Sequence, residues 1–282
     1  MRITVLSLFP EILRGFFETS IMKRAVEKGL VTYELVNIRD YATDKHHKCD
    51  DLTYGGGAGM LMLPGPLSGA LEAAGVVTKS SGGARGARTV YLTPSGRLLN
   101  QAYSHDLALE GHLVLVCGRY EGIDQRIIDE YVDDELSIGD YVLSSGEIAA
   151  LVLVDSVYRL IPGVISGESL AEESFSLIGT AESASFDALS ARDASEVHRA
   201  ALLEYPQFTR PAVFASMPVP DVLTSGHHAK IIRWRLKEQL RKTLAYRPEL
   251  LASGELPKEA LVLLKELMTE GGIDGPHPEN PG

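Results

Sequence analysis

Four short apolar runs constrain the fold of this chain more than any other feature of its sequence. Their hydrophobic residues are nearly continuous instead of alternating with polar ones, which is the pattern of parallel strands covered on both faces. The runs span residues 3–9, 33–38, 89–93 and 113–117. Because helix-like segments separate them, we expect an α/β fold on an open, mostly parallel sheet, with ligands at the carboxyl ends of its strands.

The segments between the runs carry the signals of helices. Pro10 is placed to open a helix and Gly29 to end it, since proline suits the first helical turn and glycine the C-terminal cap. Further helices are expected over residues 66–74, 98–109 and 147–160. Residues 78–88 are rich in glycine and serine, and we expect a flexible surface loop there.

A change in composition divides the chain. Its 282 residues are enough for one large or two modest domains. From residue 166 to 204 the sequence is rich in Ser, Ala, Glu and Asp and poor in large apolar residues. We expect a first domain over 1–165, a linker over 166–204 with a short helix near 194–203, a small all-helical domain over 205–270 and a disordered tail over 271–282.

Composition excludes several classes of protein. An apolar fraction of 45% with 23% charged residues is ordinary for a soluble globular chain, and no apolar run is long enough to cross a bilayer. Cys49 and Cys117 alone can form neither a disulfide framework nor a zinc site. No histidine has the spacing of a zinc protease, and no nucleophile elbow of a serine hydrolase is present. We expect a cytoplasmic protein.

Glycine-rich turns follow two of the strand-like regions. Residues 117–124 and 137–147 place glycines and small hydroxyl residues where the chain must turn sharply. Main-chain groups left unpaired in such turns can bind the edge of a ligand, and glycine lets that ligand come close. The two segments therefore predict a pocket that suits a nucleoside. A third glycine-rich stretch, residues 54–60, lacks the spacing of a phosphate loop, and by composition alone a plain glycine turn is the favoured interpretation.

These segments belong to a longer series of ordered landmarks that resembles one family, the bacterial tRNA (guanine-37-N1)-methyltransferases of the SPOUT class. The landmarks lie at residues 50–51, 54–60, 91–97, 117–124, 137–147, 161–164, 173–175, 209–211, 225–230 and 234–235. The resemblance implies a deep trefoil knot at the cofactor pocket and a homodimer with shared active sites. It implies methyl transfer from S-adenosylmethionine to N1 of guanosine 37 in tRNAs with guanosine at position 36. It also implies a role for magnesium, but the sequence has no dedicated ligand spacing and we assign no metal residue.

The same resemblance assigns roles to individual positions. Glu173 falls where the family carries the general base, and Arg159 matches an arginine that supports the reacting base. A carboxylate can remove the N1 proton while a cation stabilises charge on O6. The cofactor-contacting positions are Tyr91, Leu92, Pro94, Gly118, Ile138, Gly139, Asp140, Tyr141, Val142, Leu143 and Gly146. The positions near the target base or the tRNA are Asp50, Tyr54, Gly59, Arg119, Glu121 and Ser174.

A net charge of −11 argues against nucleic-acid binding by the whole chain, but one helix departs from this balance. Glu238 is the only acid between His227 and Arg247. Four basic residues of this stretch recur at intervals that share one helical face, namely Lys230, Arg233, Lys237 and Arg241. We interpret this basic stripe as a contact for tRNA phosphates, with a solvated charged face as the alternative.

The chain departs from the family pattern in three places. Glu173 replaces the usual aspartate, Ser145 stands where glycine is usual, and the linker carries an insertion around 178–199. Ser145 would strain the backbone if that position needs a positive φ. Two other functions stay open: a knotted methyltransferase for another RNA, such as ribosomal RNA, and a non-catalytic tRNA-binding module. Without the resemblance, Glu173 would be a solvated linker carboxylate.

Overall fold

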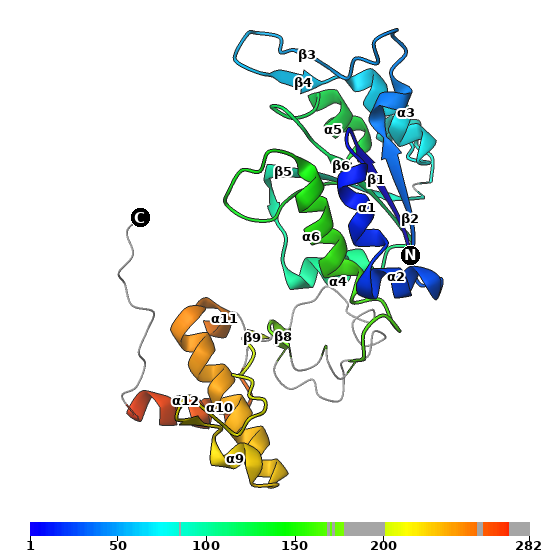
Figure 1. The fold of residues 1–282 in the computed structure, drawn as a ribbon. Coiled ribbons are helices and arrows are strands. Elements are labelled where there is room, and N and C mark those ends of the chain that lie inside the picture. The colour runs from blue at the N-terminus through cyan, green and yellow to red at the C-terminus, as the bar shows by residue number, and fades with distance from the viewer. Residues whose placement is uncertain (85, 168–169, 171–172, 178–200, 253–255, 271–282) are drawn as a thin grey trace. The chain divides into compact units, whose positions relative to one another are not determined.

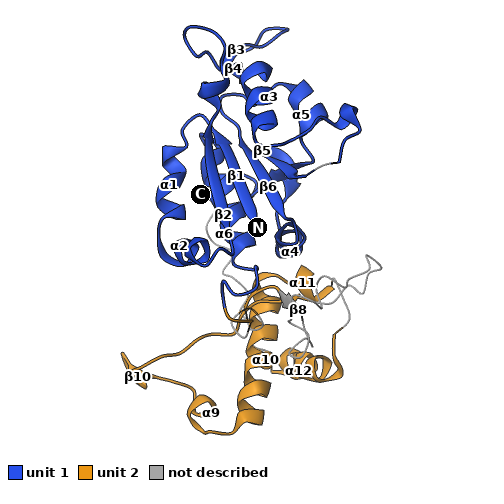
Figure 2. Ribbon diagram, turned by 90° about the vertical axis from the view of Figure 1, so that its right-hand side faces the viewer, with its two compact units in different colours: residues 1–165 blue, residues 166–282 orange. Residues whose placement is uncertain are grey.

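The computed structural model describes the chain except for residues 85, 168–169, 171–172, 178–200, 253–255 and 271–282 (Figure 1). It separates into two compact units, Met1–Ile165 and Ser166–Gly282 (Figure 2). The predicted tail and most of the predicted linker lie outside the described residues. The short helix predicted near 194–203 is described only from residue 201 onward, and there the chain forms a strand instead.

The first unit is built on a five-stranded parallel sheet in the order β2-β1-β6-β5-β7. Its strands are β1 (Arg2–Ser7), β2 (Thr32–Asn37), β5 (Arg88–Leu98), β6 (His112–Cys117) and β7 (Asp134–Ser137). The four predicted strands and the parallel α/β sheet are confirmed. The apolar pattern missed β7 because two acidic residues begin it.

Helices cover both faces of this sheet (Figure 1). They are α1 (Glu11–Phe17), α2 (Ser20–Glu27), α3 (Pro64–Ala73), α4 (Gln101–Ala108), α5 (Gln125–Tyr131) and α6 (Gly146–Tyr158). Short 3₁₀ turns lie at η1 (Ile38–Tyr41) and η2 (Lys79–Ser81). After the first residue of each strand, every residue of β1 and β6 is buried, so side chains of both faces meet a core, as the continuous apolar runs predicted.

The helix predicted between Pro10 and Gly29 is in fact two helices. Glu18 and Thr19 separate α1 from α2, and α2 begins at Ser20, which has a left-handed φ of 54°. Gly29 does end the second helix, with a φ of 70°. There the Leu30 amide donates to the Ala25 carbonyl at 3.0 Å and the Gly29 amide to Val26 at 2.9 Å, the pattern of a Schellman cap.

The end of β5 bulges out of the sheet. Leu92 and Arg97 both pair with Leu136 of β7, so residues 93–96 form an excursion between two paired stretches. A side chain at Gly96 would lie 2.5 Å from the backbone of Glu135, which makes glycine necessary where the strand rejoins. Since Leu98 still belongs to β5, the helix predicted from residue 98 starts only at Gln101.

A small hairpin packs beside the loop that follows β6. It consists of β3 (Asp50–Leu52) and β4 (Met60–Met62), with the glycine-rich residues 54–60 at its turn. The Glu121 amide donates to the Met60 carbonyl at 3.1 Å, and the Met62 amide donates to Gly122 at 3.0 Å. These bonds attach the hairpin to the loop after β6.

The second unit is mainly helical and has its own core. Its helices are α9 (Asp221–Thr224), α10 (His228–Tyr246), α11 (Glu249–Ala252) and α12 (Lys258–Thr269). Leu240, Leu263 and Leu267 are buried in that core. Two short strand pairs accompany the helices, β8 (Ser176–Leu177) with β9 (Ala201–Leu202) and β10 (Val213–Phe214) with β11 (Met217–Pro218).

The prediction of an all-helical domain is therefore wrong in this detail. The β10–β11 hairpin turns at Ala215 and Ser216, which both have positive φ without being glycine. Hairpin turns of this kind are normally announced by Asn-Gly or Asp-Gly, so the sequence carried no signal for it.

Candidate functional site

Three loops of the first unit enclose a cavity of about 210 Å³ at the carboxyl ends of β5, β6 and β7. The bulge of β5, the loop after β6 and the loop after β7 each supply part of its wall. Nearly all the positions predicted to contact a cofactor line this cavity: Tyr91, Leu92, Pro94, Gly118, Ile138, Gly139, Tyr141, Val142, Leu143 and Gly146. Asp140 is the exception, since it is exposed and outside the lining.

Two glycines form the floor where β6 meets the start of α6. The Gly146 amide donates to the Gly118 carbonyl at 2.9 Å. A Cβ at Gly146 would lie 2.8 Å from the Gly118 nitrogen, and a Cβ at Gly118 would lie 2.8 Å from the Tyr91 ring. Both positions therefore require glycine, because a Cβ at either would collide with protein atoms that already pack there.

The loop after β7 keeps its shape through another glycine. Gly139 has a φ of 153°, and a Cβ there would meet the Tyr141 ring at 2.4 Å. The Ser137 hydroxyl accepts from the Gly139 amide at 3.2 Å and donates to its carbonyl at 3.0 Å. Ser145 has a φ of −170°, which is extended backbone, so its replacement of glycine stores no strain.

Charged side chains enter the cavity from the loop after β6. Arg119 and Glu121, both predicted to lie near the substrate, are part of the lining. The Arg119 guanidinium lies 4.2 Å from the centre of the Phe9 ring, and its Nε is buried with no hydrogen-bond partner among the described residues. A cation on an aromatic face keeps its charge available for a further anionic or carbonyl partner.

The glycine-rich hairpin reaches this charged wall. A Cβ at Gly59 would lie 2.4 Å from the Glu121 side chain, so the two predicted substrate positions are in direct contact. Asp50 lies near Tyr120: burial and then the charge of Asp50 raise the pKa of the Tyr120 phenol. Tyr54 is fully exposed at the turn and lines no part of the cavity. The hairpin therefore reaches the cavity through Gly59 and not through Tyr54.

Sequence reasoning missed several lining residues: Thr93, Tyr120, Gly122, Leu136, Ser137, Ser144, Ser145 and Ala149. Most of them directly flank predicted positions, so neighbourhood in the glycine-rich loops was the available signal. Tyr120 has a φ of 58°, a conformation that an aromatic residue rarely adopts and that nothing in the sequence announces.

The two predicted catalytic residues lie outside this cavity. Arg159 follows the last turn of α6, whereas Gly146 at the first turn lines the cavity. At about 1.5 Å per residue the two ends of this helix are roughly 20 Å apart. Glu173 and Ser174 belong to the second unit, where the Ser174 hydroxyl accepts from the Glu204 amide at 3.0 Å. The first unit contains the cavity and Arg159, whereas Glu173 belongs to the second unit.

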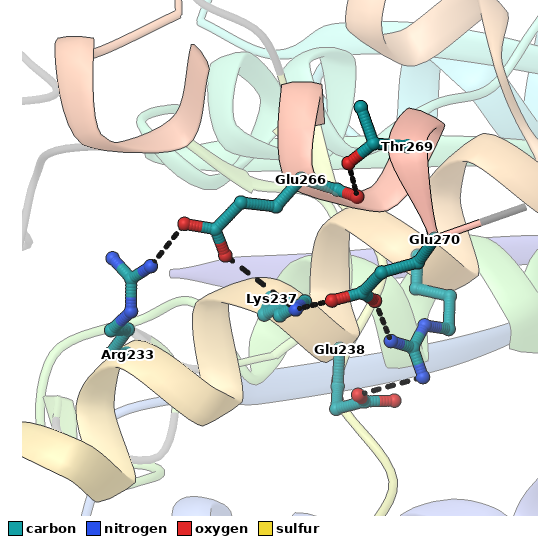
Figure 3. A network of polar contacts seen from close by, with 7 residues as sticks. Arg233, Lys237, Glu238, Glu266, Thr269 and Glu270 are labelled. Atoms are coloured by element: carbon teal, nitrogen blue, oxygen red, sulfur yellow. Dashed lines mark hydrogen bonds and ion pairs between the residues drawn. The ribbon is translucent and has the colours of Figure 1, made fainter. Parts of the chain in front are cut away.

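The basic stripe on α10 is largely neutralised by another helix (Figure 3). Glu266 of α12 lies 2.5 Å from Arg233 and 3.6 Å from Lys237. Glu270, which follows α12, lies 2.6 Å from Lys237 and 3.4 Å from Arg241. Residues 227–247 do carry an excess of positive charge. In the fold, however, Glu266 and Glu270 lie beside them, and both acids come from outside that stretch of sequence.

The described residues were also compared with the requirements of a membrane span and of a metal site. Among the described residues, no helix is long and apolar enough to span a membrane. Within the same residues, no three His, Cys, Asp or Glu side chains are grouped so that they could hold a metal ion.

Comparison with known proteins places the chain in one group. A family model described as tRNA (Guanine-1)-methyltransferase TrmD matches residues 1–253. The tRNA (guanine-N(1)-)-methyltransferase of Treponema denticola is 54% identical over 274 residues, which cover 96% of this chain and 100% of that protein. The protein of the same name from Treponema pallidum is 53% identical over 99% of this chain and 100% of its own length. That of Borreliella burgdorferi is 51% identical over 89% of this chain and 92% of its own length.

Proposed function

The chain belongs to the tRNA (guanine-1)-methyltransferase family, and from this premise we propose that it methylates N1 of guanosine 37 in tRNAs with guanosine at position 36. The methyl donor in this proposal is S-adenosylmethionine. One observation carries the proposal: loops far apart in the sequence converge on a single cavity that contains nearly all the expected cofactor positions. Relatives at about half identity over nearly the whole chain favour this function over a ribosomal RNA substrate or a non-catalytic module.

The cavity has the character expected for this cofactor. Its floor is formed by Gly118 and Gly146, which carry no side chain, so an adenine edge meets main chain there. Leu92, Ile138 and Leu143 supply apolar surface for a ring. A mostly apolar cavity with a few placed polar groups is typical of nucleoside sites.

The path of the chain around the cavity is compatible with the trefoil knot of this family. β7 pairs with β5 at the edge of the sheet, but the next helix starts against Gly118 at the end of β6. The loop over residues 138–145 therefore returns across the bulge of β5 to reach β6. We include the knot in the proposal on this ground.

Each charged residue then has a task in the reaction. The bound cofactor supplies a methyl group already activated on a sulfonium. Guanine N1 is a poor nucleophile until its proton leaves, and Glu173 is the proposed base that takes it. Arg159 stabilises the negative charge that develops on O6, while Arg119 and Glu121 hold the guanine beside the cofactor. Positioning of this kind can lower a barrier by roughly 7–11 kcal/mol.

The proposed active site combines two protomers. Arg159 lies roughly 20 Å along α6 from the cavity of its own chain, so a partner must bring this residue to the reacting base. The helix has exposed apolar residues suited to such an interface: Ile148 is 49% exposed and Val152 is 44% exposed. Ile12 on α1, which packs against α6, is 44% exposed. A helix that is apolar on almost every side needs a covering partner.

Contact with tRNA involves the second unit in this proposal. Lys230 is exposed on α10, and Arg233, Lys237 and Arg241 extend the same stripe. RNA phosphates compete there with Glu266 and Glu270, so each contact replaces an existing ion pair instead of meeting a free cation. We assign no ligand for magnesium among the described residues. The proposal includes a cytoplasmic location, where tRNA is found.

Nucleoside analysis of tRNA is the decisive experiment. Transcripts with guanosine at positions 36 and 37 are incubated with the protein and S-adenosylmethionine, and the modified nucleosides are identified by mass spectrometry. The proposal expects 1-methylguanosine at position 37, with strong loss when either guanosine is replaced. Methylation of ribosomal RNA but not of tRNA would support the alternative enzyme, and cofactor binding without any turnover would support the binding module.

A further inference from the structure

A fully buried carboxylate lies directly behind the cavity and has no part in the proposed reaction. Glu147 is 0% exposed in the first turn of α6. Its Oε1 accepts the Ser7 hydroxyl at 2.6 Å, and its Oε2 has no hydrogen-bond partner among the described residues. Burying a carboxyl group with a single hydrogen-bond partner costs folding free energy, which suggests a functional role for Glu147.

The Glu147 carboxyl group lies among polar groups at the start of α6. Glu147 lies in the first turn of a helix, where free amide groups and the helix dipole favour a negative charge. The Ser7 hydroxyl accepts from the Phe9 amide at 2.8 Å, so its proton is directed at Glu147. The thiol of Cys117 is also buried nearby, and burial first and Glu147 second raise the pKa of that thiol well above its usual value.

The carboxylate connects three elements that form the floor of the cavity. Ser7 ends β1, while Cys117 and Gly118 end and follow its neighbour β6. Gly146, the residue before Glu147, has its amide bonded to Gly118, and a Cβ on Gly146 would lie 2.9 Å from the Cys117 Cα. The Ser7–Glu147 bond thus holds the first turn of α6 down on the strand ends that the cavity uses.

We infer that Glu147 is a positioning residue for the cofactor cavity, acting through the Ser7 hydroxyl to hold the contact between Gly146 and Gly118. This inference rests on the proposed binding of S-adenosylmethionine at that cavity. Without the bond, the start of α6 is free to move away from β6, and the Gly118 and Gly146 main chains no longer face a ligand together. The remainder of α6 keeps its own packing against the sheet, so the loss falls on binding more than on folding.

The test compares variants by calorimetric titration of S-adenosylmethionine and by thermal melting of the unliganded protein. Glu147→Ala and Ser7→Ala should each weaken cofactor binding about tenfold, and the double variant should be no weaker than either, because both remove the same bond. Glu147→Gln keeps an oxygen that accepts from Ser7 and should stay within about threefold of the unmodified protein.

The matched control is Ser104 of α4, which contacts α6 near the end of that helix far from the cavity. Ser104 is 1% exposed and its hydroxyl bonds that of Ser156 on α6 at 3.1 Å. Ser104→Ala therefore removes a buried hydroxyl against α6 far from the cavity, and it should lower the melting temperature without changing cofactor affinity.

The outcomes separate the inference from the proposed function. If the unmodified protein fails to bind S-adenosylmethionine, the proposed function is wrong. If it binds, and Ser7→Ala and Glu147→Ala lose melting temperature but no more affinity than Ser104→Ala, then Glu147 is only part of the core. Should Glu147→Ala not fold, Ser7→Ala together with Glu147→Gln still decides the question.

Discussion

The cofactor cavity and the basic stripe of α10 were both predicted from local sequence, but the fold treats them differently. The cavity depends on main-chain groups and on glycines at positions where any side chain would collide with neighbouring atoms. The stripe depends on side-chain charge, and Glu266 and Glu270 cancel much of it. Glycines in the loops themselves mark the turns of the cavity in the sequence, although the atoms that exclude a side chain there belong to distant segments. The charge of a surface has no such local mark, because it sums over everything that packs beside it.

The largest expected effect is that a change at Glu173 lowers the rate of methyl transfer and leaves cofactor affinity nearly unchanged. Glu173→Ala should lower the rate of tRNA methylation about 100-fold or more, because removal of the N1 proton loses its base. Affinity for S-adenosylmethionine should stay within about threefold, since Glu173 lies in a different unit from the cavity. Single-turnover rates and calorimetric titration measure the two. Glu173→Asp should keep substantial activity, and full activity in the alanine variant would make Glu173 a solvated carboxylate.

A smaller effect tests the glycine floor. Gly118→Ala places a Cβ 2.8 Å from the buried Tyr91 ring, and overpacking of this kind costs about 1–3 kcal/mol. Binding of S-adenosylmethionine should weaken about tenfold or more, which calorimetric titration can measure. Gly111→Ala is the matched control, because a Cβ there meets nothing within 4 Å. Unchanged affinity in Gly118→Ala would show that the cavity does not need this glycine.

A still smaller effect, of the opposite sign, is expected at the stripe. Replacing both Glu266 and Glu270 by glutamine removes the acidic partners of Arg233 and Lys237, and it leaves Arg241 paired only with Glu238 at 3.2 Å. Affinity for tRNA should rise about threefold, within the range of exposed ion pairs. Its salt dependence should steepen, since more cations then release counterions from RNA.

Filter binding across a salt series measures both quantities. Glu259→Gln removes an exposed acid of the same helix outside the network and should have less effect. If the double variant binds tRNA no better than the unmodified protein, α10 is a solvated face and tRNA contacts the chain elsewhere.

The smallest effect is a pH dependence of stability. The hydrogen bond from Lys237 lowers the pKa of Glu270 below its usual value, with the charges of Lys237 and Arg241 adding to the shift. A carboxyl group whose pKa is lower in the folded state stabilises the protein above its unfolded pKa, and that contribution is lost as pH falls through the folded pKa.

Glu270→Gln should therefore lower the melting temperature slightly at neutral pH, and the difference from the unmodified protein should vanish in acid. Thermal melts between neutral pH and the range where carboxylates titrate measure it, with Glu259→Gln as the control. A difference that persists unchanged in acid would mean that the ion pair with Lys237 contributes nothing.

Local sequence determined the parallel sheet, the apolar helix α6 and the glycine-rich loops of the cavity, because strand burial, helix capping and tight turns depend on residues that are neighbours in the chain. The resemblance to the tRNA (guanine-1)-methyltransferases was confirmed by the family model and the relatives. Strand β7, the break between α1 and α2 and the β10–β11 hairpin escaped local reasoning. Polar residues begin the first, and the other two use left-handed residues that are not glycine.

Only the tertiary structure decided which distant groups meet. It paired the cations of α10 with Glu266 and Glu270, it placed Gly146 against Gly118, and it buried Glu147 against Ser7. Each of these contacts joins residues separated by the packing of whole elements, and their electrostatic energy depends on distance in space and on burial. No periodicity or motif along the chain carries that information.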